Sequence, residues 1–295
     1  MRVAIAGSSG LLGTALTQHL RQNGHAVVRL VRREPHGPGE RRWDPGARTI
    51  AEPGLSDMDA VVNFAGAGIA DARWTPEHKI AMRASRLSTT QTIVNALADA
   101  PNCRTFLSGS AIGYYGSRGA EALDEASTNG TGFLAELVRD WEQAADQAPD
   151  HVRVVKLRTG HVLSRNGGIL GKQRLLFQLG AGGRIGDGRQ YVSWISIEDY
   201  VRACEFLLTH DEISGPVNLT GPKPVPNADF AKAFARALNR PAIVPVPLFA
   251  ARLLFTGEMV QDAMLASQNA QPKALLKAGF EFLHDDVDKA MESVN

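Results

Sequence analysis

Three glycines at intervals of three residues follow the first apolar run of the chain. Residues 3–6 are all apolar, as in a strand buried on both faces, and Gly7, Gly10 and Gly13 come directly after them. Leucines at positions 12, 16 and 20 then mark one face of a helix. Between a strand and a helix, such glycines permit a tight turn, close approach of the backbone to a pyrophosphate, and close helix–strand packing. A plain strand–helix turn is the alternative. We expect a dinucleotide phosphate site formed by Gly7, Ser8, Ser9, Gly10, Leu11, Leu12 and Gly13.

Two arginines after the second expected strand bear on which dinucleotide would bind. That strand covers residues 26–31, and Arg32 and Arg33 stand where an acidic residue would bind the ribose hydroxyls of NAD. Guanidinium groups suit a 2′-phosphate because they donate charge-assisted, bidentate hydrogen bonds. Glu34 follows and could still serve a ribose, and a solvated strand end is the other interpretation of the arginines. The sequence favours NADP(H), with Arg32 at the 2′-phosphate.

Further motifs along the chain resemble one protein superfamily. These are residues 63–66 and 108–116, each after an expected strand, residues 182–195, and the C-terminal segments 257–259, 267–268 and 272–280. Together with the glycine loop they resemble the atypical extended short-chain dehydrogenases/reductases. More narrowly, the chain is similar to the epimerase family whose bacterial members are often labelled nucleoside-diphosphate-sugar epimerase or cell-division inhibitor.

The resemblance covers essentially the whole chain and implies several properties. It implies a Rossmann domain, a small C-terminal domain and a nicotinamide nucleotide, NADP(H), but it supplies no substrate. It places Ala65, Gly66, Ala67 and Ser108 against the cofactor. It also points to Arg189, Gln190 and Trp194 as contacts for a small-molecule substrate. A homodimer is common in the superfamily, and the sequence does not test it.

The catalytic pair of typical relatives is missing from this chain. Those relatives carry Tyr-x-x-x-Lys on the helix after the serine-bearing strand, and the lysine lowers the pKa of the tyrosine. Here that helix reads FLAELVRDW over residues 133–141, with Phe133 and Leu137 at the two places, or Leu134 and Val138 after a shift of one residue. None of the four tyrosines has a lysine four residues later.

Three interpretations remain open. In the first, Tyr114 or Tyr115 is a substitute acid/base and Ser110 orients the substrate of an oxidoreductase or epimerase-like enzyme that acts on a sugar nucleotide or carbonyl compound. Arg158 and His161, just after the next expected strand, are further candidates. In the second, the protein is a non-catalytic NADP(H) sensor. The third is a structural or interaction protein without a nucleotide, which the glycine loop disfavours.

The alternation of short apolar runs with helical patterns predicts an α/β fold. We expect a Rossmann-type doubly wound parallel sheet with a small helix-rich C-terminal substrate domain. The NADP-binding domain is expected to comprise residues 1–165 and 190–220, and the substrate domain residues 166–189 and 221–295. Helices in the second domain are expected near residues 230–238, 250–266 and 272–279.

Composition excludes several other classes of protein. The chain has 295 residues, and its 32 Lys and Arg balance 31 Asp and Glu, which argues against a nucleic-acid partner. Its apolar runs are all shorter than the ~18 residues that suggest a membrane span. Cys103 and Cys204 are far apart in the sequence, so neither zinc nor a disulfide scaffold is expected. We expect a cytoplasmic protein without a metal.

Overall fold

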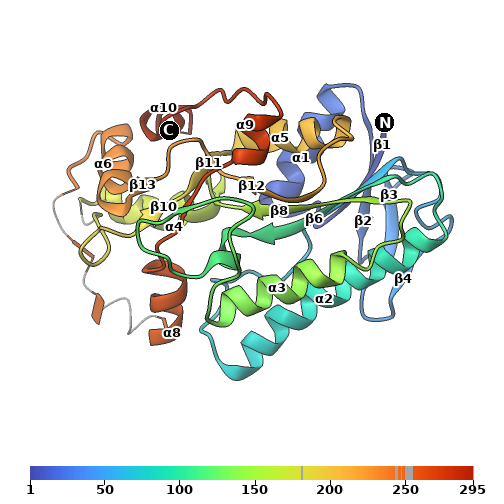
Figure 1. The fold of residues 1–295 in the computed structure, drawn as a ribbon, viewed down its shortest axis with the longest axis horizontal. Helices are drawn as coiled ribbons and strands as arrows, with labels where there is room; N and C mark the ends of the chain where they lie inside the picture. The colour runs from blue at the N-terminus through green and yellow to red at the C-terminus, as the bar shows by residue number, and fades with distance from the viewer. Residues whose placement is uncertain (181, 243–244, 247, 250–254, 295) are drawn as a thin grey trace.

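A mostly parallel sheet lies at the centre of the computed structural model, which describes residues 1–180, 182–242, 245–246, 248–249 and 255–294 (Figure 1). The described part of this sheet has eight strands in the order β12-β8-β6-β5-β1-β2-β3-β4, and only the β3–β4 pair is antiparallel. The order reverses beside β1, as in a doubly wound sheet. The strands are β1 (Arg2–Ala6), β2 (Ala26–Val31), β3 (Glu40–Asp44), β4 (Thr49–Ile50), β5 (Ala60–Asn63), β6 (Thr105–Ala111), β8 (Arg153–Thr159) and β12 (Gly215–Leu219).

Helices cover both faces of this sheet (Figure 1). On one face α1 (Leu11–Gln22) packs against α5 (Ile197–Thr209), and on the other α2 (Pro76–Ala98) packs against α3 (Phe133–Ala145). Successive residues of β1 alternate between two apolar clusters, because neighbouring side chains of a strand point to opposite faces. The apolar run at residues 3–6 is therefore buried on both sides, and the expected doubly wound α/β fold is confirmed.

A smaller lobe packs around a separate apolar cluster, whose members include Phe177, Trp194, Phe230, Phe234 and Met291. Figure 1 shows α6 and α10 together at one end of the molecule. The lobe and its connections contain β9 (His161–Ser164), α4 (Gly168–Gln178), β10 (Tyr191–Val192), β11 (Trp194–Ser196), β13 (Val225–Pro226), α6 (Asn227–Ala237) and α10 (Val287–Ser293). The division of the chain into two domains at the expected boundaries stays a prediction.

The remaining elements join the C-terminal segment to the sheet. They are a 3₁₀ turn (Ile112–Tyr115), β7 (Ala122–Leu123), α8 (Gly257–Met259), a π-helix (Val260–Met264), β14 (Asn269–Ala270) and α9 (Lys273–Lys277). Of the helix expected over residues 250–266, positions 250–254 lie outside the described residues.

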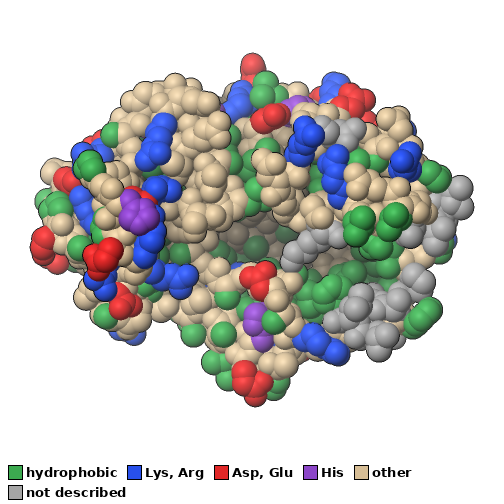
Figure 2. All heavy atoms as spheres, turned by 180° about the vertical axis from the view of Figure 1, so that it is seen from behind, with side chains coloured by type: hydrophobic (Ala, Val, Ile, Leu, Met, Phe, Trp, Pro, Cys, Tyr) green, Lys and Arg blue, Asp and Glu red, His purple; other side chains and the backbone are tan. Residues whose placement is uncertain are grey.

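Figure 2 shows the opposite side of the molecule, which is hollowed near its centre with hydrophobic side chains beside the hollow. No helix in the described ranges is long and apolar enough to cross a membrane.

Candidate cofactor and active site

The glycine loop connects β1 to α1 at the carboxyl edge of the sheet. Gly7 has a φ of +74°, and a Cβ there would lie 2.7 Å from the backbone nitrogen of Ala65. A Cβ on Gly13 would lie 2.3 Å from the carbonyl oxygen of Gly7. At Gly10, by contrast, the nearest atom is the same oxygen at 3.4 Å. Gly7 and Gly13 are therefore required by the packing of the loop, whereas Gly10 leaves room for a Cβ.

The start of α1 suits an anion. Gly10 is its N-cap and contributes no capping side chain, and the first turn contains no acidic residue. The N–H groups of a first helical turn have no partner within the helix, and the helix dipole adds partial positive charge there. The room at Gly10 therefore lies next to backbone donors. These features fit the phosphates of a dinucleotide.

The segment after β5 closes the site on its other side. The Asn63 side chain accepts a hydrogen bond from Ala65 N–H at 3.0 Å, and Ala67 N–H donates to Ser85 Oγ at 3.0 Å. Gly66 lies against Arg86, since a Cβ on it would be 3.2 Å from Arg86 Cγ. The segment at residues 65–67 is thus fixed beside Gly7, where contact with a cofactor was expected. Ser108 is fully buried within β6 and pairs with Asn63 of β5.

Arg33 is engaged with a neighbouring carboxylate. Its Nη1 and Nη2 lie 2.7 and 2.8 Å from the two carboxylate oxygens of Glu40. This hydrogen bond from Arg33 is the main reason that the pKa of Glu40 falls to about 2. Glu34 likewise pairs with Arg42. Arg33 and Glu34 therefore already have partners of opposite charge.

Arg32 is a free cation at the same edge of the sheet. It follows β2 directly and is exposed, and it has no hydrogen bond or ion pair with any residue that the structure describes. Because Leu30 of β2 pairs with Ala6 of β1, Arg32 and the glycine loop leave neighbouring strands at almost the same level. Of the two expected phosphate ligands, Arg32 is the one available to an anion.

Ser110 and Tyr115 belong to a buried network. Ser110 Oγ donates to Glu142 Oε1 at 2.6 Å, and Arg158 donates to both carboxylate oxygens of Glu142 at 2.8 and 2.9 Å. Arg158 also donates to the Tyr115 hydroxyl at 3.0 Å, which in turn donates to Asn218 Oδ1 at 2.7 Å. Burial raises the pKa of Tyr115 to about 12. Both hydroxyls are therefore engaged with buried partners, and the catalytic roles expected for Ser110 and Tyr115 stay predictions.

Tyr114 and His161 differ in their surroundings. Tyr114 is half-buried, with the Arg158 guanidinium 3.6 Å from its ring centroid, and its hydroxyl has no partner among the described residues. It is the one expected catalytic hydroxyl that remains unengaged in the described part of the chain. Burial lowers the pKa of His161 to about 4, so its imidazole is neutral near neutral pH.

Two of the three expected substrate contacts are buried, and the assignment of all three as substrate contacts stays a prediction. Trp194 is fully buried, and its indole N–H donates to the Lys223 carbonyl at 3.0 Å. Gln190 is buried and donates to the Ile185 carbonyl at 3.1 Å. Only Arg189 extends into solvent, with 90% of its side chain exposed. An indole side chain can pack in a core or contact a ligand, and the sequence pattern does not distinguish these two possibilities.

The face of α3 that meets the loop after β6 is apolar. A Cβ on Gly113 would lie 3.5 Å from Leu134 Cβ and 3.9 Å from Val138 Cγ2. Phe133 packs instead against Trp74, at 5.4 Å between ring centroids, and Leu137 is buried in the same cluster. The shifted register, with Leu134 and Val138 facing the loop, therefore describes α3 better than Phe133 and Leu137.

A small polar cavity opens beside Leu134. It has a volume of about 150 Å³, and its lining includes Gly113 of the loop after β6, Thr131 before α3, and Gln261 and Asp262 of the π-helix. The sequence analysis did not identify Asp262. In the sequence, the one feature that could have pointed to Asp262 is that its carboxylate stands within the largely apolar stretch 259–265.

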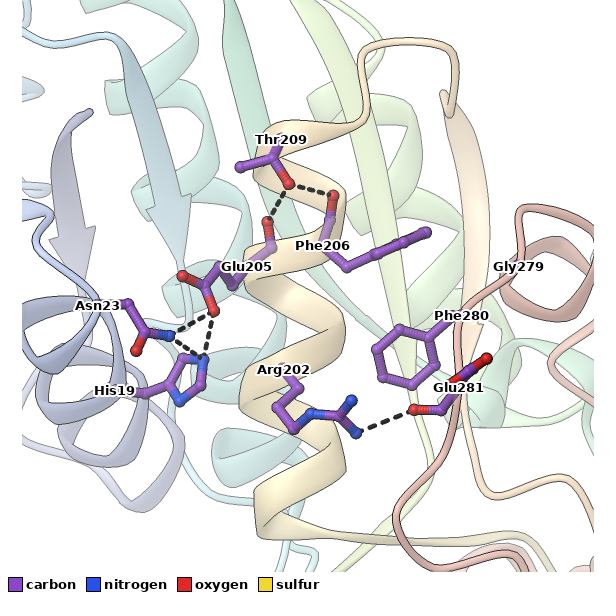
Figure 3. A pocket seen from close by; sticks show the side chains of 9 residues that line it. All are labelled: His19, Asn23, Arg202, Glu205, Phe206, Thr209, Gly279, Phe280 and Glu281. Carbon is purple, nitrogen blue, oxygen red and sulfur yellow. Dashed lines mark hydrogen bonds and ion pairs between the residues drawn. The ribbon is translucent and has the colours of Figure 1, made fainter.

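A larger pocket of about 530 Å³ lies on the α1–α5 face (Figure 3). There Glu205 accepts hydrogen bonds from His19 and Asn23, each at 2.7 Å, and Arg202 donates to the Glu281 carbonyl at 3.0 Å. None of the expected cofactor or catalytic residues lines it. Within the described ranges, no three His, Cys, Asp or Glu side chains group so as to hold a metal ion.

The doubly wound sheet, the glycine loop at its carboxyl edge and the free arginine after β2 define a dinucleotide-binding class of α/β protein. The chain belongs to the NAD dependent epimerase/dehydratase family, which it matches over residues 3–220. Residues 246–294 match a separate domain of unknown function.

Relatives and solved structures agree with this assignment. An epimerase family protein of Mycobacterium bovis is 48% identical over 290 residues, covering 98% of this chain and 96% of that protein. The crystal structure of human epimerase family protein SDR39U1 with NADPH has a TM-score of 0.92 at 34% identity, covering 100% of this chain and 99% of that one. A nucleoside-diphosphate sugar epimerase from Corynebacterium glutamicum has a TM-score of 0.82 at 38% identity, covering 100% of this chain and 58% of that one.

Proposed function

We propose that this protein binds NADP(H) along the carboxyl edge of the sheet and acts as an oxidoreductase on a small carbonyl or sugar-nucleotide compound. The observation that carries the proposal is the room for a ligand at Gly10, at the start of α1, which has no side-chain cap, with the exposed Arg32 after the neighbouring strand. A pyrophosphate next to Gly10 is stabilised by the backbone donors of α1. The NADPH in the related human structure supports this choice of cofactor.

The residues of this chain then divide the work of binding. The Arg32 guanidinium binds the 2′-phosphate, which distinguishes NADP(H) from NAD(H). Residues 65–67 pass beneath the cofactor, and the buried pair of Glu142 and Arg158 fixes the loop that carries Tyr114. When bound, NADPH supplies a hydride to a carbonyl carbon, and the protein must supply a proton to the carbonyl oxygen.

A second candidate function is a non-catalytic NADP(H) sensor. It is favoured by one observation: Leu134 and Val138 face the loop after β6, where a tyrosine and a lysine would otherwise supply the acid/base pair. The sensor binds the same nucleotide through the same loop. It differs from the enzyme only in lacking turnover.

The test is oxidation of NADPH, followed by its absorbance, with a panel of aldehydes, ketones and sugar nucleotides. The enzyme proposal expects turnover of at least one compound, and it expects Gly10→Val protein to be inactive with that compound. Binding of NADPH without turnover of any of them favours the sensor. Failure of the wild-type protein to bind NADPH contradicts both.

A further inference from the structure

The cavity beside Leu134 brings together three features that no single segment provides. It lies against the loop after β6, which follows a carboxyl strand end, as ligand sites do in α/β sheets. It lies against the first turn of α3, at Leu134 and Ala135. Its third wall is the π-helix Val260–Met264, and π-helical turns occur often at functional sites.

Asp262 is the ionisable side chain that lines this cavity. Its Oδ2 approaches the turn before α3, since a Cβ on Gly132 would lie 3.0 Å from it. The backbone N–H of Phe133, at the first residue of α3, acts on this carboxyl and by itself would lower its pKa. Burial raises the pKa of Asp262, and the charges that act on it are those of Glu258, on the same segment, and Lys79, on α2. Lys79 and Glu258 form an ion pair with each other at 2.9 Å.

We propose that the carboxyl group of Asp262 is the acid/base of this protein, in the cavity beside Leu134. This role rests on the proposed oxidoreductase function. As the carbonyl carbon receives the hydride, the C=O π electrons move to oxygen. The O–H bond of the Asp262 carboxylic acid breaks and an O–H bond forms on that oxygen. This leaves Asp262 as a carboxylate, which regains a proton from water. In the oxidative direction the Asp262 carboxylate accepts the proton from the hydroxyl group of the substrate.

The geometry and the burial of the carboxyl support this role over simple helix capping. A carboxylate that only caps α3 would be stabilised in its charged form by the helix dipole, which lowers its pKa. Here the cost of burial outweighs the effect of the Phe133 N–H, so the pKa of Asp262 lies above that of a free carboxyl. An acid with a raised pKa is better suited to donate a proton near neutral pH.

The first experiment compares Asp262→Asn with the wild type by urea unfolding from about pH 4 to about pH 8. Asn keeps an acceptor for Phe133 N–H, so the capping contact survives. Because the folded-state pKa of Asp262 is raised above its unfolded value, its favourable contribution is present at low pH and is lost as pH rises through the folded pKa. The unfolding midpoint of the wild type should therefore fall relative to that of Asp262→Asn as pH increases. The opposite trend would show a capping carboxylate and overturn the proposal.

The second experiment measures NADPH oxidation with the compound that the wild type turns over fastest. Asp262→Asn should lower kcat by about 100-fold or more, the usual size of an acid/base contribution, with an unchanged dissociation constant for NADPH. Asp288→Asn, in the exposed pair with Arg236, is the matched control and should leave kcat unchanged. Full activity of Asp262→Asn overturns the proposed role of Asp262 but leaves the oxidoreductase function standing. A wild type that binds NADPH but reduces nothing contradicts the oxidoreductase function and this role with it.

Discussion

At the scale of the residue, two adjacent arginines differ in their partners. Arg33 is held by Glu40 through two hydrogen bonds, and Arg32 has no partner in the described structure. The sequence analysis assigned the 2′-phosphate to Arg32, but nothing in the sequence indicated that Glu40 would pair with Arg33. The pairing of Arg33 with Glu40 follows from the fold, because β3 lies next to β2 and places Glu40 beside Arg29 and Arg33.

Replacing each arginine by alanine separates the two tasks. Arg32→Ala should weaken NADPH binding about tenfold or more, because a hydrogen bond to a charged group contributes about 1.5–3 kcal/mol. NADH binding should be nearly unchanged. Arg33→Ala, which removes an exposed ion pair, should weaken NADPH binding by less than about fivefold. Calorimetric titration gives all four constants, and equal losses of NADPH and NADH affinity in Arg32→Ala would refute the phosphate role.

At the scale of the element, α3 is tied to β6 and β8 by one buried ion pair. The Glu142 and Arg158 side chains are 6% and 3% exposed, and they bond to Ser110 and Tyr115 from the loop and strand between them. Removing one member of such a pair leaves the other charge buried without a partner. We therefore expect this pair to hold the loop after β6 in place.

Truncation of Glu142 tests that expectation. Glu142→Ala should reduce the free energy of unfolding by about 3–5 kcal/mol, measured by urea denaturation. Glu121→Ala, which removes the exposed pair with Arg118, is the control and should cost no more than about 1 kcal/mol. A loss for Glu142→Ala as small as that of the control would show that the pair does not hold the loop.

The elements themselves could be predicted from the sequence to a large extent. The glycine loop, the buried strands and α1 follow from local pattern, because glycine spacing and apolar periodicity report directly on turns and buried faces. The burial of Tyr115, Gln190 and Trp194 could not be predicted, since tyrosine and tryptophan suit a core as well as a ligand. Asp262 reaches the loop after β6 only through folding of the C-terminal segment, so no local pattern pointed to it.

At the scale of the whole molecule, the proposed site draws on two parts of the chain. The large sheet supplies the glycine loop and Arg32 from strand ends that meet at one edge. The C-terminal segment adds Asp262 to the loop after β6 and, through β14, an extra strand beside β7. Cofactor binding is therefore expected to depend on the large sheet alone. Proton transfer is expected to depend on the sheet and the C-terminal segment together.

The most direct test of the central claim is thermal unfolding of wild-type and Gly10→Val protein with NADPH, NADP⁺, NADH or NAD⁺ added in turn. A ligand at 100 times its dissociation constant stabilises the folded state by about 2.7 kcal/mol, or a rise in Tm of about 5 °C or more. The account predicts this rise for wild type with the two phosphorylated nucleotides and none for Gly10→Val. The Tm of Gly10→Val without ligand should stay near that of the wild type, because a Cβ at Gly10 makes only an ordinary contact, 3.4 Å from the Gly7 carbonyl oxygen. An equal rise in both proteins, or no rise with any nucleotide, would contradict it.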